Sequence, residues 1–160
     1  MNTELSPKEQ IKLSALLVTS KLDKYIKLHD SFLKQSGTLR SFIRNIFWTS
    51  VPFDRFVEQT LAIEKEMLST INGISSVHDN IKSFMTAEEE KYMSCLLRYT
   101  QSLHQTIIAL RNYQEGFLKK SKGEKLEWAT SKELLAKYQQ SIKEYQEIGI
   151  ELNSLSYVIF

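Results

Sequence analysis

Apolar residues recur along residues 7–35 at alternating spacings of four and three, which is the period of one face of an α-helix. This stripe consists of Ile11, Ala15, Val18, Leu22, Tyr25, His29 and Phe32. Ser6, Pro7 and Glu9 read as a capping box, with a hydroxyl before the first helical residue and a carboxylate three residues later. Gly37 then favours the end of the helix. The pattern predicts a helix over about residues 7–35.

A broader apolar stripe begins near Phe53, after Pro52, and keeps heptad spacing as far as Met85. A flanking row seven residues apart, from Phe56 to Phe84, widens this stripe to about three positions per heptad. A two-stranded coiled coil needs only two apolar positions per heptad. We therefore expect a helix over about residues 53–85 that contacts several neighbours inside a bundle.

The same spacing predicts helices over about residues 87–121 and 125–158, the first of them behind a second capping box that opens at Thr86. A short helix over 39–48 is expected between Gly37 and Pro52. Short connections force neighbouring helices to run antiparallel. The sequence thus predicts a single domain over residues 1–160, an all-α, antiparallel up-down bundle of four long helices with one short connecting helix.

Composition agrees with this picture and excludes several classes of protein. Apolar residues make up 42% of the 160 residues and charged residues 25%, which is typical of a globular chain. The net charge of +2 is too small to indicate a nucleic-acid-binding protein. Cys95 is the sole cysteine, so an internal disulfide and a multi-cysteine metal site are excluded. No window approaches the ~18 apolar residues that span a bilayer, and we expect a soluble, cytoplasmic protein.

Candidate chemistry is sparse. His29, His78 and His104 are predicted on three different helices, and their positions along the bundle axis place them too far apart to share one metal ion. No glycine-rich phosphate loop is present. Cys95 stands beside two leucines, as a small buried apolar residue does. We therefore expect no metal, no cofactor and no catalytic residue.

One spacing has a counterpart in an enzyme family. Arg98 and His104 are spaced Arg-x5-His, which resembles the motif of the small helical HEPN ribonucleases, although Tyr99 stands where that family usually has a polar residue. The resemblance implies a ribonuclease in which these two residues act together. Positions six apart on one helix differ by about 240°, so convergence would require a dimer or a break in the helix.

The predicted bundle gathers basic and aromatic residues at one end. Its candidate binding residues are Arg40, Arg44, Trp48, Lys119, Lys120 and Lys122. A basic, aromatic surface suits an anionic partner or a membrane surface, whereas a purely structural interpretation has the aromatic side chains close the core.

The function we expect is non-catalytic interaction or scaffolding, with another macromolecule bound through a helix face or through this basic, aromatic end. The expected partner is another protein, and a homo-oligomer is compatible with the broad stripes. Peripheral membrane binding through residues 39–56 is the first alternative, and a HEPN-like ribonuclease is the second. A nucleic acid is not the expected partner in the principal interpretation.

Overall fold

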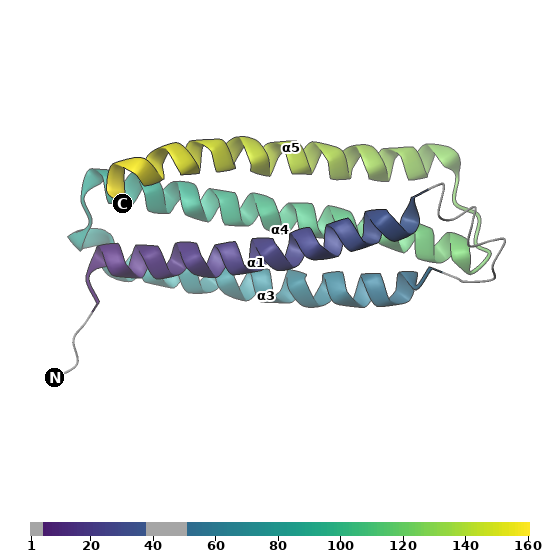
Figure 1. Cartoon of the computed structure of the whole chain (residues 1–160), viewed down its shortest axis with the longest axis horizontal. Helices are drawn as coiled ribbons and strands as arrows, with labels where there is room; N and C mark the ends of the chain where they lie inside the picture. Colours follow the sequence, from purple (N-terminus) through teal and green to yellow (C-terminus); the bar gives the residue numbers. More distant parts are fainter. Residues whose placement is uncertain (1–4, 38–50) are drawn as a thin grey trace.

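The computed structural model describes residues 5–37 and 51–160, and within these ranges it is a bundle of four long α-helices (Figure 1). In chain order they are α1 (Pro7–Ser36), α3 (Phe53–Ile81), α4 (Ala87–Ser121) and α5 (Trp128–Ile159), and a 3-10 turn, η1 (Lys82–Phe84), follows α3. Successive helices run in opposite directions along a common axis. The predicted all-α antiparallel bundle is confirmed. The short helix expected over 39–48 lies outside the described residues.

Capping boxes begin two of the helices. At the start of α1, the backbone N–H of Ser6 donates to Glu9 Oε2 over 2.8 Å, and the N–H of Glu9 donates to Ser6 Oγ over 3.4 Å. Thr86 and Glu89 repeat the pair at the start of α4, at 2.8 and 3.2 Å. Each box gives partners to two backbone donors that the helix itself leaves free, which is why both starts are readable from the sequence.

Two helix ends differ from the apolar pattern. Helix α3 ends at Ile81 and tightens into η1, and its three-residue turn carries Phe84 off the buried face, so that Phe84 is 75% exposed. Helix α5 begins at Trp128, three residues later than expected. Trp128 precedes the buried Tyr138 by ten residues, which places it about 80° away around the helix. Its side chain is therefore 77% exposed and does not join the core.

Helix α4 forms the centre of the core, because it packs closely against α1, α3 and α5. Its fully buried apolar residues lie one or two helical turns apart: Met93, Leu96, Leu103, Ile107 and Leu110. They meet large buried side chains of the neighbouring helices, among them Ile11 and Phe32 of α1 and Met67 of α3. The heptad stripes of the sequence correspond to this shared core.

Large aromatic side chains fill the space between α1 and α5, whose backbones approach each other less closely than those of the other neighbouring helices. The hydroxyls of Tyr25 and Tyr138 lie 2.8 Å apart, and His29 Nδ1 also bonds to the Tyr138 hydroxyl. Tyr145 packs edge-on against both Tyr25 and Tyr99, with ring centroids 6.1 and 6.0 Å apart. We call the residues Tyr25, His29, Tyr99, Tyr138 and Tyr145 the aromatic seam.

Ion pairs link α4 to both of its antiparallel neighbours. Arg111 Nε donates to Glu64 of α3 over 2.6 Å, and Arg98 pairs with Glu151 of α5. Both pairs join a basic residue of α4 to an acidic residue of a neighbouring helix, an attraction that favours the antiparallel arrangement. Within the described ranges, no helix combines the length and the apolarity that crossing a lipid bilayer requires.

Candidate functional site

The basic, aromatic end is described only in part. Three of its six predicted residues lie outside the described residues: Arg40, Arg44 and Trp48. The other three lie exposed at the end of α4: Lys119, Lys120 and Lys122. Cations at a helix C-terminus interact favourably with the helix dipole, so their position has a structural cause as well. Their role in binding stays a prediction.

Most of the described aromatic residues near this end belong to the core. The rings of Phe53 and Phe117 stack with centroids 5.4 Å apart, and Phe117 also meets Phe32 edge-on at 6.0 Å. Phe56 is 4% exposed. Residues 39–56 form the segment of the membrane-binding alternative. In the described part of this segment, Phe53 and Phe56 therefore pack toward the bundle.

The three histidines lie in separate surroundings. His29 belongs to the aromatic seam, and burial lowers its pKa. His78 Nε2 lies 3.0 Å from both carboxylate oxygens of Glu90. Burial also lowers the pKa of His104, against the opposing field of Glu64. Among the described residues, no three His, Cys, Asp or Glu side chains come together as a metal site would require.

Arg98 and His104 do not meet within one chain. Arg98 points toward α5, where it pairs with Glu151, whereas His104 lies on the side of α4 that feels Glu64 of α3. Cys95 is buried, and burial raises the pKa of its thiol, which keeps the sulfur protonated and unreactive. A ribonuclease site built from Arg98 and His104 would need a second copy of the chain.

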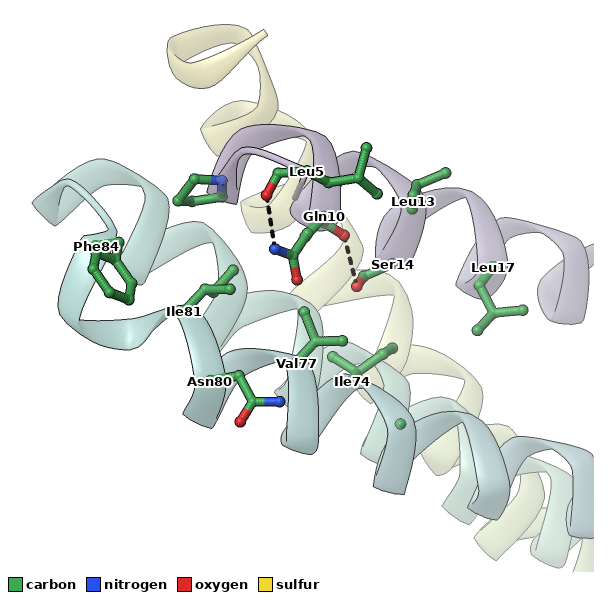
Figure 2. Close-up of a pocket in the computed structure, with 12 residues that line it drawn as sticks. Leu5, Gln10, Leu13, Ser14, Leu17, Ile74, Val77, Asn80, Ile81 and Phe84 are labelled. Atoms are coloured by element: carbon green, nitrogen blue, oxygen red, sulfur yellow. Dashed lines mark hydrogen bonds between the residues drawn. The ribbon is translucent and has the colours of Figure 1, made fainter. Parts of the chain in front are cut away.

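An apolar groove lies between the first three turns of α1 and the last turns of α3 (Figure 2). Its volume is about 870 Å³. Twelve residues line it, and none of them is charged: Leu5, Pro7, Gln10, Leu13, Ser14, Leu17, Gly73, Ile74, Val77, Asn80, Ile81 and Phe84. Figure 2 shows the leucines of α1 opposite Ile74 and Val77 of α3, with Phe84 beyond the end of that helix. We call this feature the α1–α3 groove.

The α1 wall of the groove consists mainly of apolar residues that lie beside the buried stripe, whereas α3 contributes the core residues Ile74 and Ile81. Leu13 and Leu17 are 53% and 43% exposed, because they lie to one side of the buried face marked by Ile11 and Val18. On the facing helix, Gly73 contributes no side chain, and a Cβ added there would meet nothing within 4 Å. Leucines on one wall and a missing side chain on the other leave a hydrocarbon-lined space open to solvent.

The polar atoms at the start of the groove already have partners. Gln10 Nε2 donates to the Leu5 carbonyl over 2.9 Å, and Ser14 Oγ donates to the Gln10 carbonyl over 2.9 Å (Figure 2). These bonds stay within α1 and the residues that precede it. An apolar ligand could therefore cover this part of the groove without leaving these donors unpaired.

Charged side chains lie where the groove ends. Two lysines of α1, Lys21 and Lys24, both donate to the same oxygen of Glu66 on α3, each over 2.7 Å. Their hydrogen bonds hold the pKa of the Glu66 carboxyl below its usual range. The bridge lies between one and two helical turns beyond Leu17.

No protein-family model, curated protein or solved structure matches this chain. The chemistry of the α1–α3 groove is therefore the guide to function. Its lining offers hydrocarbon surface and no charged group or imidazole, which suits the binding of an apolar surface rather than a reaction.

The sequence predicted binding through a helix face without saying which face. A signal was present, because Leu13 and Leu17 stand off the predicted stripe of the first helix. Gly73 was a second signal, since glycine inside a helix destabilises it by about 0.5–1 kcal/mol relative to alanine. What the sequence did not show was that these features face each other across two helices.

Proposed function

We propose that this protein is a non-catalytic interaction module that binds an α-helix of another protein in the α1–α3 groove. The observation that carries the proposal is the lining itself, a space of about 870 Å³ with no charged side chain, bordered by half-exposed leucines. Contiguous exposed apolar surface of this kind marks interaction sites in proteins.

The shape of the groove suits a helical ligand. Two antiparallel helices form its walls, and from Pro7 to Leu17 it extends about 15 Å, or about three helical turns. An amphipathic helix docks in such a groove through apolar residues at positions i, i+3 or i+4, and i+7. Covering a half-exposed side chain such as Leu13 or Leu17 contributes roughly 1 kcal/mol each.

The test uses a displayed library of helix-forming peptides, about 25 residues long so that they exceed the groove. Binders selected on the wild-type protein are measured against Gly73→Leu, which places a side chain in the open space of the groove. We expect Gly73→Leu to weaken binding about tenfold or more, because it occupies the volume that the ligand's apolar residues need.

Gln139→Leu is the matched control, because it adds the same side chain at an exposed position of α5. It should leave the affinity within about twofold. Both variants are first shown to keep wild-type helicity. Binders whose affinity is the same for Gly73→Leu and for Gln139→Leu would contradict the proposal. A wild-type dimer that becomes a monomer in Gly73→Leu would also contradict it, since a second copy would then occupy the groove.

A further inference from the structure

The space between α1 and α3 continues beyond the lysine–glutamate bridge. A second, shallower pocket of about 430 Å³ lies there, between the second half of α1 and the first half of α3. Its apolar floor comes from Leu28, Ala62 and Ile63, and its two charged lining residues are Lys24 and Lys27. The face between the two helices therefore changes from an uncharged groove to a pocket with a cationic border.

The positive charge on this border exceeds the acidic charge that meets it. Lys21 and Lys24 share a single oxygen of Glu66, so two cations face one carboxylate. Lys27 is exposed and has no ion-pair partner among the residues that the structure describes. Lys27 is thus available to an anionic group, and Lys24 shares the one carboxylate of Glu66 with Lys21, so a second anion can approach both pocket lysines.

Two other acidic residues of α1 lie close to Lys27. Asp23 precedes it by four residues and Asp30 follows it by three, so all three side chains share the exposed face of the helix. Neither carboxylate lines the second pocket, and among the described residues neither forms an ion pair with Lys27. The field of Asp30 also acts on His29 and Tyr138.

Resting on the proposed function, we propose that the bound helix carries an acidic residue about two turns beyond its apolar stripe, and that Lys24 and Lys27 bind this carboxylate. The spacing follows from α1 itself, since Leu17 and Lys24 are seven residues, or about 10 Å, apart. The apolar residues supply most of the affinity, and the ion pair fixes which end of the ligand helix lies at the second pocket.

The selected peptides of the same library provide the first test. We expect peptides that bind wild type to be enriched in Asp or Glu about two turns past one end of the apolar stripe. Lys24→Glu with Lys27→Glu should weaken their binding about tenfold at low salt and less at high salt. Lys137→Glu with Lys143→Glu makes the same charge change at exposed positions of α5, and it should leave the affinity within about twofold.

A charge exchange makes the test specific. A peptide whose acidic residue is replaced by lysine should bind wild type weakly and regain affinity for the doubly reversed protein. Lys27→Glu alone is included because it breaks no ion pair that the structure describes, so its effect reports on the ligand and not on the bundle.

The two proposals fail in different ways. Peptides that lose affinity for Gly73→Leu but bind Lys24→Glu with Lys27→Glu as tightly as wild type would overturn the charge inference and leave the groove function standing. Peptides that are insensitive to Gly73→Leu would overturn the groove function itself. Absence of rescue in the charge exchange, with both proteins folded, would also overturn the charge inference.

Discussion

Gln114 offers a direct test of how this core is held together, through the substitution Gln114→Met. Its side chain is fully buried on α4, and its Oε1 lies 2.6 Å from Thr60 Oγ1 of α3. Its Nε2 has no hydrogen-bond partner among the described residues. The Thr60 hydroxyl also lies 2.8 Å from the Phe56 carbonyl, and one hydroxyl proton cannot serve both acceptors fully.

Either orientation of the amide leaves part of it unpaired. If Thr60 donates to Gln114, the amide nitrogen of Gln114 has no hydrogen-bond acceptor among the described residues. If Thr60 instead donates to Phe56, the amide must turn its nitrogen toward the hydroxyl, and its oxygen then loses its partner. A buried polar group without a partner costs about 1–3 kcal/mol, whereas a typical hydrogen bond contributes a net of about 1 kcal/mol.

We therefore expect Gln114→Met to raise the free energy of unfolding by about 1 kcal/mol. Methionine keeps the unbranched shape and removes the amide, and Thr60 retains the Phe56 carbonyl. For a chain of this length, about 1 kcal/mol corresponds to a rise in Tm of about 2–4 °C. Urea unfolding followed by circular dichroism measures the change, and Gln139→Met, at an exposed position, should stay within about 0.5 kcal/mol of wild type.

A loss of stability of about 1 kcal/mol or more in Gln114→Met would refute this reasoning. It would show that both ends of the Gln114 amide are satisfied in solution, with a buried water as the obvious partner.

Three further predictions concern other parts of the bundle. Gly73→Ala should raise the free energy of unfolding by about 0.5–1 kcal/mol in urea titrations, because the new methyl group meets nothing within 4 Å and the unfolded chain loses freedom. Tyr138→Phe should lower the free energy of unfolding by about 1–3 kcal/mol, because it leaves the buried Tyr25 hydroxyl without a partner. Tyr25→Phe should lower it less, because the Tyr138 hydroxyl keeps its bond to His29. Burial lowers the pKa of His29 and His104 below the unfolded value of about 6.5, so the unfolded state takes up more protons and stability should fall as the pH drops from about 7 to 5. Thermal melts across that range should show a smaller loss in a variant with His29→Asn and His104→Asn.

Much of the fold follows from local rules. The capping boxes at Ser6 and Thr86 mark helix starts because they satisfy backbone donors within four residues, and apolar periodicity marks the buried faces. The exposure of Trp128 and Phe84 could not be predicted from these rules, because each residue lies at a helix end, where a shift of a few residues in the helix boundary turns the side chain away from the core.

The candidate site was less accessible from the sequence. The α1–α3 groove depends on which faces of two helices adjoin, and their apolar patterns do not fix the rotation of one helix against the other. The shared contact of Lys21 and Lys24 with Glu66 joins residues more than forty positions apart, at a register set by the whole bundle. The position of the lysines at the end of α4 could be predicted, because a helix end and its flanking charges are evident from a few consecutive residues.

The tyrosines of the aromatic seam, together with Tyr92 and Tyr113, also set an alkaline limit on the bundle. Burial raises the pKa of six tyrosines, to about 12 at Tyr99: Tyr25, Tyr92, Tyr99, Tyr113, Tyr138 and Tyr145. Their phenols are neutral in the folded state, so the stability linked to them is present below the unfolded pKa of about 10 and is lost as the pH rises above it. Ionisation of these phenols is therefore coupled to exposure of the core, and a rise in the ultraviolet absorbance of phenolate that coincides with loss of helicity would report the opening of the bundle without any added label.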